Sequence, residues 1–325
     1  MLEKPISPRQ MNEVVRTQAI DQPLVYILVL NWRSAADTIA CVESVLKLDY
    51  PNYRILVIDN DSQDGSERVI RDRFTSLEFI QTGRNSGYAG GNNQGMLYAL
   101  KKEAEYIWIL NPDVRVKKDS LSKMVNLMLQ DESVGLCGPR ILEGMHENYM
   151  RVDGGKITPS EGYRFEHLEA SPGEEAAGVK EVDYVIGCSL LIRARVLHDA
   201  GLFREDFFWY SDDVEFCFRV RKLGWKTVIL MKAENFHYVW QGKKDEPHHN
   251  FYAVRSRIIL ARLEKKYLGK TILSELGYYF LEDAFRGSVS LRTAAREVYY
   301  RIMRHSVPVI SALCCRLKKI PRVIC

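Results

Sequence analysis

Short apolar runs alternate with helical patterns along the first third of the chain. The apolar runs that predict strands are residues 24–30, 53–58, 77–81 and 106–110. The stretches whose apolar spacing predicts helices are 35–48, 66–74 and 92–102. This β-α-β-α order predicts an α/β fold with a parallel sheet covered by helices, in which ligands bind beyond the carboxyl ends of the strands.

The pattern changes after Pro112. A helix is predicted at 121–129, and short strands are predicted at 134–137 and 182–193. The polar segment 146–178 has little periodicity and is predicted to form loops and irregular strands over the crevice. From residue 250 onward the spacing is mostly helical.

Composition narrows the class of protein. With 325 residues, 46% hydrophobic and 27% charged, the chain is expected to be globular, which excludes disorder, collagen and coiled coil. No run approaches the roughly 20 apolar residues of a membrane span, and residues 1–21 lack the apolar block of a signal peptide, so we expect a cytoplasmic protein. Seven scattered cysteines without a Cys-x-x-Cys pair predict reduced, packed thiols rather than disulfides or a zinc knuckle.

The charge is unevenly distributed. Residues 291–325 carry eight basic residues against one acid, a local charge of +7, so the rest of the chain carries −3 of the net +4. A mildly acidic body argues against a nucleic-acid partner. The basic segment is interleaved with apolar residues, which fits either an anionic membrane surface or a helix that packs on the body with a solvated basic face.

Polar residues follow the predicted strands. Asn31, Asp59 and Asn111 each come directly after an apolar run, and the glycine-rich stretch 83–95 follows the third run. Four strand ends are therefore expected to converge on one crevice. Asp59 begins an acidic stretch that resembles a calcium-binding loop, but neither possible register places the required Glu at the twelfth position. Two interpretations of Asp59 remain: a carboxylate that binds a ligand, or part of a turn whose acids cap the following helix.

The glycine-rich stretch lacks the spacing of both the dinucleotide and the Walker loops. Its glycines allow close backbone approach, and a helix beginning near Asn92 would offer amide donors to an anion beside Arg84. The alternative is a turn that uses glycine only for its backbone angles. In Asn111-Pro112-Asp113, the proline stiffens the turn and Asp113 is expected to point outward, able to bind a hard cation.

An aromatic run, 207–210, precedes an acidic helix start at Asp212 and Asp213. Helix capping explains one of the two acids but not both. Two carboxylates behind four consecutive aromatic residues are what we expect in the wall of a sugar-binding site. A carboxylate at a helix start is expected to have a lowered pKa and to stay ionised. His237 lies in a short apolar run, where a histidine is more often a hydrogen-bonded core residue than a metal ligand.

Together these segments resemble the family 2 glycosyltransferases with the GT-A fold, most closely the rhamnosyltransferase-like members that build bacterial surface polysaccharides. The matching pieces lie in the family's order at 29–32, 57–60, 84–95, 111–113, 187–193, 212–215 and His237. The resemblance implies a Rossmann-like nucleotide-diphospho-sugar transferase (GT-A) domain over 24–265, an N-terminal extension at 1–23 and a helical basic C-terminal extension at 266–325.

The resemblance also implies roles for individual residues. Asp213 would be the catalytic base, and the divalent metal, Mg²⁺ or Mn²⁺, would bind Asp113 with His237 as a candidate further ligand. The family's Asp-x-Asp-like metal motif begins with Asn111 here. Implied donor-binding residues are Asn31, Asp59, Arg84, Asn85, Gly87, Asn92 and Asn111. Implied acceptor-side residues are Gly187, Cys188, Ser189, Trp209 and Asp212.

The implied activity is that of an inverting, metal-dependent hexosyltransferase. It would move a sugar, with rhamnose as a candidate, from a dTDP- or UDP-linked donor to a hydroxyl of a glycan or a lipid-linked acceptor. The basic C-terminal segment would allow peripheral association with the inner face of the cytoplasmic membrane. Two other classes remain open: a non-catalytic nucleotide-sugar-binding or complex-organising protein of the same fold, and a sugar nucleotidyltransferase.

Overall fold

The computed structural model describes residues 22–145, 148–161, 163–170, 178–238 and 247–272 of the chain. The described residues fall into two units. The first unit spans residues 1–156, 167–208 and 212–240, and the second spans 157–166, 209–211 and 241–325. Most of the predicted N-terminal extension and the whole basic segment 291–325 lie outside the described residues.

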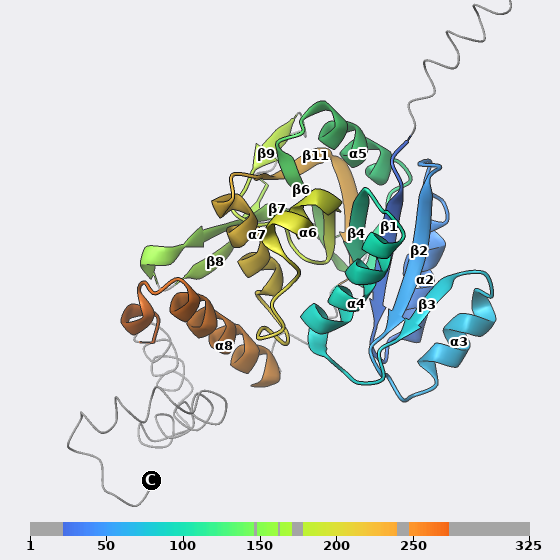
Figure 1. Cartoon of the computed structure of the whole chain (residues 1–325), viewed down its shortest axis with the longest axis horizontal. Helices are drawn as coiled ribbons and strands as arrows, with labels where there is room; N and C mark the ends of the chain where they lie inside the picture. The colour runs from blue at the N-terminus through green and yellow to red at the C-terminus, as the bar shows by residue number, and fades with distance from the viewer. Residues whose placement is uncertain (1–21, 146–147, 162, 171–177, 239–246, 273–325) are drawn as a thin grey trace, which may run out of the picture. The chain divides into compact units, whose positions relative to one another are not determined.

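Four parallel strands form one half of the sheet in the first unit (Figure 1). They lie in the order β3-β2-β1-β4 and are β1 (Val25–Asn31), β2 (Tyr53–Asp59), β3 (Glu78–Gln81) and β4 (Tyr106–Leu110). The register places Asn31 beside Asp59 and Asp59 beside Gln81. Three polar side chains therefore end three neighbouring strands in one row at the carboxyl edge.

Helices cover both faces of these strands because the strands are apolar on both faces. Val25, Ile27 and Val29 belong to the same buried cluster as the apolar residues of α2 (Ala35–Val45). The alternate residues Leu28 and Leu30 face α4 (Gly87–Lys101). The remaining helices of the first unit are α3 (Ser66–Arg73), α5 (Ser120–Gln130), α6 (Ala194–Ala200) and α7 (Asp212–Lys222).

The other half of the sheet is mixed, so the prediction of a parallel sheet holds only for the first four strands. Here β10 (Ser189–Arg193) pairs antiparallel with β4, and β6 (Val134–Met145) follows it. β11 (Lys226–His237) then pairs with β6 and with the short β5 (Val114–Val116). The remaining elements are β7 (Asn148–Thr158), a 3₁₀ turn (Pro159–Glu161), β8 (Arg164–Glu169), β9 (Val179–Glu181) and α8 (Pro247–Leu263).

Several predicted elements differ from those observed. The helix expected near Asn92 begins five residues earlier, at Gly87, because its glycines serve close packing rather than a loop. A Cβ at Gly91 would lie 2.6 Å from Leu30 Cδ1, and one at Gly95 would lie 2.4 Å from Ile58 Cδ1. The segment expected to form irregular strands instead contains the regular strand β7, paired antiparallel with β6.

The cysteines that the structure describes are unpaired thiols, as the sequence predicts. Cys41, Cys137, Cys188 and Cys217 are free and buried. Burial raises the pKa of Cys41 and of Cys137 to about 12, so both are protonated thiols at neutral pH. Within the described part of the chain, no helix is both long enough and apolar enough to span a membrane.

Candidate functional site

A buried hydrogen-bond network closes the carboxyl edge of β1, β2 and β3. Asn31 donates to Asp59 Oδ2 at 2.5 Å, and Gln81 donates to Asp59 Oδ1 at 2.9 Å. Ser62 donates to both oxygens of Asp59, from its backbone N–H at 2.9 Å and its hydroxyl at 2.6 Å. Burial opposes ionisation, but the bonds from Ser62, Gln81 and Asn31 outweigh it and hold the pKa of Asp59 below its ordinary value.

Asp59 therefore holds the side chains at this edge of the sheet in place. A carboxylate has about four lone-pair positions, and protein donors supply four hydrogen bonds to Asp59. Sequence reasoning singled out Asp59 and Asn31 but missed Ser62 and Gln81. Gln81 is the last residue of a predicted strand, and this position at a strand end could have identified it as a neighbour of Asp59.

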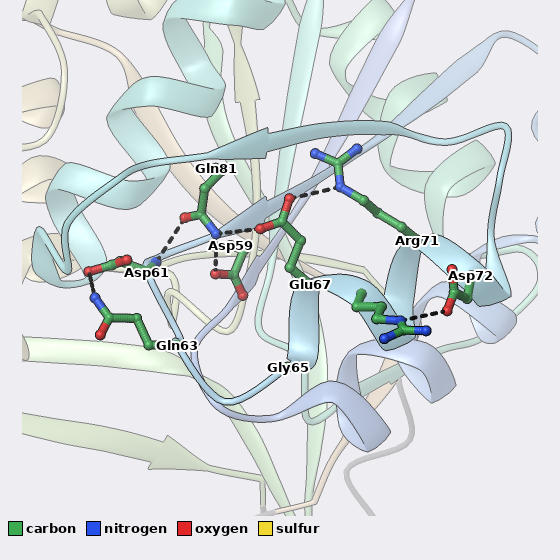
Figure 2. Close-up of a pocket in the computed structure, with 9 residues that line it drawn as sticks. Asp59, Asp61, Gln63, Gly65, Glu67, Arg71, Asp72 and Gln81 are labelled. Carbon is green, nitrogen blue, oxygen red and sulfur yellow. Dashed lines mark hydrogen bonds and ion pairs between the residues drawn. The ribbon is translucent and has the colours of Figure 1, made fainter.

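A pocket of about 490 Å³ opens beside this network (Figure 2). Figure 2 shows the Gln81 carboxamide between Asp59 and Glu67, and it donates to a carboxylate oxygen of each. The Gln81 oxygen accepts from the Asp61 backbone N–H at 3.2 Å. The remaining lining residues come from the turn after β2 and from α3: Gln63, Gly65, Arg68, Arg71 and Asp72.

The start of α4 is fixed by close backbone contact. Gly87 has φ +71°, and a Cβ there would lie 2.0 Å from the backbone oxygen of Phe208. The Asn85 side-chain oxygen accepts from the Gly87 N–H at 2.9 Å and from Asn60 Nδ2 at 3.0 Å. Arg84 stands at the exposed edge of this turn, with its Nε 3.3 Å from the Ser86 hydroxyl.

Asn92 lies in the second turn of α4, not at the helix start where the sequence placed it. It is fully buried, and its Nδ2 donates to the Tyr88 carbonyl at 3.0 Å. Its side-chain oxygen is buried without a hydrogen-bond partner among the described residues. Asn92 therefore has an acceptor to offer, but no exposed amide end.

Strand register brings Asp113 and His237 together. His237 pairs with Val114 at the end of β11, and the Tyr238 N–H donates to the Asp113 carbonyl at 3.0 Å. His237 Nε2 consequently lies 3.4 Å from Asp113 Oδ1. Sequence analysis favoured a core histidine at this position from the local pattern alone, whereas the structure places it against the carboxylate named by the family resemblance.

The Asp113–His237 pair fits part of a divalent-metal site. Two neighbouring ligands of one octahedral ion with bonds of about 2.1 Å lie roughly 3 Å apart, close to the observed separation of the two donor atoms. Oxygen and imidazole nitrogen donors both suit Mn²⁺. Among the described residues, no group of three or more His, Cys, Asp or Glu side chains is arranged to hold a metal.

Asp213 is held against the segment that precedes β10. Its Oδ2 accepts from the Gly187 N–H at 2.7 Å, and its Oδ1 accepts from the Val214 N–H at 2.8 Å. The Tyr88 hydroxyl donates to the carbonyl of the same Gly187 at 2.7 Å. The sequence named Gly187 and Asp213 but missed Tyr88, whose hydroxyl carried no local signal.

The two acids at the start of α7 differ in environment. Asp212 is 3% exposed, and its Oδ2 has no hydrogen-bond partner among the described residues, whereas Asp213 is partly exposed. Burial, and then the charge of Asp213, raise the pKa of Asp212 well above its ordinary value. Burial also raises the pKa of Asp213, although the Gly187 and Val214 N–H groups oppose the change.

The expected lowering of the Asp213 pKa is therefore wrong. The helix start does supply amide donors to the carboxylate, but burial outweighs them. The rise is larger for Asp212, so within the pair Asp212 is favoured to hold a proton and Asp213 is favoured to ionise first.

The other residues that the resemblance assigns to the acceptor side are Ser189, Cys188 and Trp209. Ser189 is fully buried, and its hydroxyl accepts from Trp108 Nε1 and from Asn235 Nδ2, both at 3.1 Å. Burial raises the pKa of the Cys188 thiol well above its ordinary value, so Cys188 contributes its backbone rather than a reactive sulfur. Trp209 belongs to the second unit, where its ring contacts Tyr210 and Tyr252.

Residues 26–199, more than half of the chain, match the family model described as "Glycosyl transferase family 2". The chain belongs to glycosyl transferase family 2. The match confirms the family predicted from the seven sequence segments, and it covers β1 through most of α6.

Curated relatives agree with this family. A low-salt glycan biosynthesis hexosyltransferase from Haloferax volcanii is 30% identical over 199 residues, covering 60% of this chain and 61% of the relative. An N-acetylglucosaminyl-diphospho-decaprenol L-rhamnosyltransferase from Mycobacterium tuberculosis is 27% identical over 209 residues, covering 57% of this chain and 66% of the relative. The chain thus matches less than two thirds of the length of each relative.

The fold also has solved counterparts. The crystal structure of GalNAc-T7 with UDP, GalNAc and Mn²⁺ superimposes with a TM-score of 0.61 at 13% identity, covering 88% of this chain and 58% of that one. At this identity the likeness concerns the fold alone. It confirms the GT-A architecture of this family 2 chain.

The contact between Gly87 and Phe208 gives a stability prediction for this family 2 glycosyltransferase. Gly87→Ala combines left-handed backbone strain with a Cβ 2.0 Å from a backbone oxygen, so it should lower the free energy of unfolding by about 3 kcal/mol or more. Gly83→Ala is the matched control, because Gly83 has φ +72° but no atom within 4 Å of the added Cβ. It should cost only about 1–2 kcal/mol of strain. Urea unfolding measures both, and equal losses would contradict the contact.

Proposed function

We propose that this protein transfers a sugar from a nucleoside-diphosphate donor to a hydroxyl of a glycan or lipid-linked acceptor, with inversion at the anomeric carbon. The observation that carries the proposal is the short segment Gly187–Cys188. Its Gly187 N–H holds the Asp213 carboxylate, and its Cys188 carbonyl accepts from the Asn111 N–H at 2.9 Å. Asn111 is two residues before Asp113, so one backbone segment links the candidate base to the candidate metal ligand.

The donor half of the proposal rests on the edge formed by β1, β2 and β3. The ionised Asp59 network and the adjacent pocket present amide and carboxylate groups suited to the NH and carbonyl groups of a uracil or thymine base. We assign Asn31, Gln81, Arg84 and Asn85 to this donor side. Asp59 acts there by fixing the network rather than by offering an unfilled oxygen.

The diphosphate half rests on Asp113 and His237. These residues would hold the divalent ion, which supplies charge neutralisation to the departing nucleoside diphosphate. Mn²⁺ accompanies UDP in the GalNAc-T7 structure, which supports the same requirement here. Asn111 contributes its backbone to the turn, which leaves Asp113 as the carboxylate of the motif.

Asp213 would take the proton from the acceptor hydroxyl. Its ionised form is needed for this step, and a raised pKa makes the carboxylate a stronger base than an exposed aspartate. Its partly exposed position allows an acceptor to reach it, whereas buried Asp212 is placed to hold the proton of the pair. The resulting single displacement gives inversion.

Removing the base should separate catalysis from binding. Asp213→Asn keeps the shape of the side chain but cannot accept the proton, so transfer should fall by roughly 10²–10⁴-fold with little change in donor affinity. Asp212→Asn is the control and should be milder, because an amide replaces a protonated carboxyl. Transfer rates with UDP- and dTDP-sugars and donor dissociation constants decide this. A larger loss of transfer for Asp212→Asn would contradict Asp213 as the base and would assign that role to Asp212.

The pH dependence follows from the same pair. Loss of transfer on acidification should begin above the pH at which an exposed aspartate is protonated, since burial raises the pKa of Asp213.

Metal dependence gives a binding prediction. Wild-type protein should bind UDP or dTDP at least about tenfold more tightly with Mn²⁺ than with EDTA, because few basic residues are available to neutralise a diphosphate. Asp113→Ala should bind equally weakly under both conditions in titration calorimetry. Equal wild-type affinities with and without Mn²⁺ would remove the ion from the proposal.

The acceptor is the remaining part of the proposal. The Mycobacterium tuberculosis relative is by its name a transferase to a lipid-linked sugar, which supports a lipid-linked acceptor here. The +7 charge of residues 291–325 supports attachment to an anionic membrane surface, with each basic residue worth about 1 kcal/mol near such a surface.

Vesicle binding tests the membrane surface. The chain should co-sediment with anionic vesicles but not with neutral ones, and Gln at Arg316, Lys318, Lys319 and Arg322 should release it. The four substitutions remove charge while keeping the apolar residues. Unchanged sedimentation of the substituted chain would favour a basic helix that packs on the body.

A further inference from the structure

The first turn of α4 is linked to the proposed base through the backbone of one residue, Gly187. The Tyr88 N–H donates to the Phe208 carbonyl at 2.9 Å, and the Tyr88 ring stacks on Phe203 with centroids 6.0 Å apart. These two contacts fix the direction of the tyrosine. Its hydroxyl then donates to the Gly187 carbonyl at 2.7 Å, while the N–H of Gly187 donates to Asp213 at 2.7 Å.

Gly187 is packed as tightly as its lack of a side chain allows. A Cβ at this position would lie 2.9 Å from the Tyr88 hydroxyl and 2.9 Å from Asp213 Oδ2. The hydroxyl and the carboxylate therefore both lie beside the same face of this α-carbon. A shift of the Gly187 backbone would lengthen one of its hydrogen bonds or press on the other side chain.

We propose that Tyr88 is a positioning residue, whose hydroxyl holds the Gly187 carbonyl and so fixes the backbone of this residue, with its N–H directed at the Asp213 carboxylate ready for the acceptor. The inference rests on the proposed function, in which Asp213 is the base. It gives a role to Tyr88, a residue of the stretch 84–95 to which the family resemblance assigned none. It also gives the glycine-rich segment a second task, since α4 begins within four residues of the donor-side Arg84.

The surroundings of Asp213 decide what loss of this hydroxyl would do. Burial, followed by the charges of Asp212 and Asp213, raises the pKa of Tyr88 well above its ordinary value, so its hydroxyl remains a donor. The Gly187 N–H favours the ionised form of Asp213. The titratable groups that influence this carboxylate or share its burial are Asp212, Glu215 and Cys217 of α7, Tyr88 of α4, Cys188 before β10 and His167 of β8.

Tyr88→Phe removes the hydroxyl and keeps the ring. A loosened Gly187 N–H would stabilise the ionised Asp213 less, so the pKa of Asp213 should rise by about half a unit to one unit. The full chain labelled with ¹³C at aspartate carboxyls reports this pKa by NMR titration, with the Asp213 signal assigned from Asp213→Asn. In transfer assays, kcat should fall about three- to tenfold with donor affinity changed less than about twofold.

Tyr50→Phe is the matched control. The Tyr50 hydroxyl also donates to a backbone carbonyl, that of Pro23, at 2.6 Å, and Tyr50 is buried. Its removal therefore has a comparable stability cost but should leave the Asp213 pKa and kcat unchanged. An Asp213 pKa within about 0.2 units of wild type in Tyr88→Phe would overturn the positioning role, as would an equal shift in Tyr50→Phe.

The NMR result stands apart from the transferase assignment. If wild-type protein transferred no sugar from any UDP- or dTDP-linked donor, the proposed function would fail. The Asp213 pKa would still report whether Tyr88 acts through Gly187. A shifted pKa with unchanged kcat would overturn Tyr88 as a positioning residue for catalysis, while leaving Asp213→Asn to decide the base.

Discussion

The antiparallel pairing of β10 with β4 is the constraint on which the site depends. Its register sets Ser189 opposite Leu110, so Gly187 and Cys188 extend past the sheet edge beside Asn111. The Asn111–Cys188 backbone bond then fixes the turn that carries Asp113, and Gly187 meets Asp213. A slip of one residue would turn every side chain of β10 to the other face and separate these groups. The two proposed chemical tasks, metal binding at Asp113 and proton removal by Asp213, would thus depend on one strand pairing.

Much of the first half of the fold could be predicted because its sequence pattern is local. Continuous apolar runs mark β1, β2 and β4, since these strands are buried on both faces. The start of α4 could not be predicted in the same way. Glycines at 91 and 95 normally indicate a loop, and only the approach of Leu28, Leu30 and Ile58 explains them inside a helix. That approach depends on tertiary packing, which periodicity does not encode.

In the candidate site, too, local sequence patterns reveal some residues, whereas others are found only from the folded structure. Asp59, Asp113 and Asp213 are visible in the sequence because each follows a strand or opens a helix. The groups that control them come from distant segments: Gln81 for Asp59, His237 for Asp113 and Gly187 for Asp213. The pKa of Asp213 shows the consequence. A helix start predicts a lowered pKa, but burial beside Asp212 raises it, and burial is a property of the folded chain.

The Asp212–Asp213 pair resolves a conflict between charge and basicity. A fully solvated aspartate is ionised at neutral pH but is a weak base, whereas a buried one is a stronger base that tends to stay protonated. Here burial raises the pKa of Asp212 more than that of Asp213, so a proton shared by the pair favours Asp212 and the charge favours Asp213. The N–H groups of Gly187 and Val214 favour that charge on Asp213. Because the Tyr88 hydroxyl bonds to the carbonyl of the same Gly187, the proposed balance of the pair depends on the helix that borders the proposed donor edge.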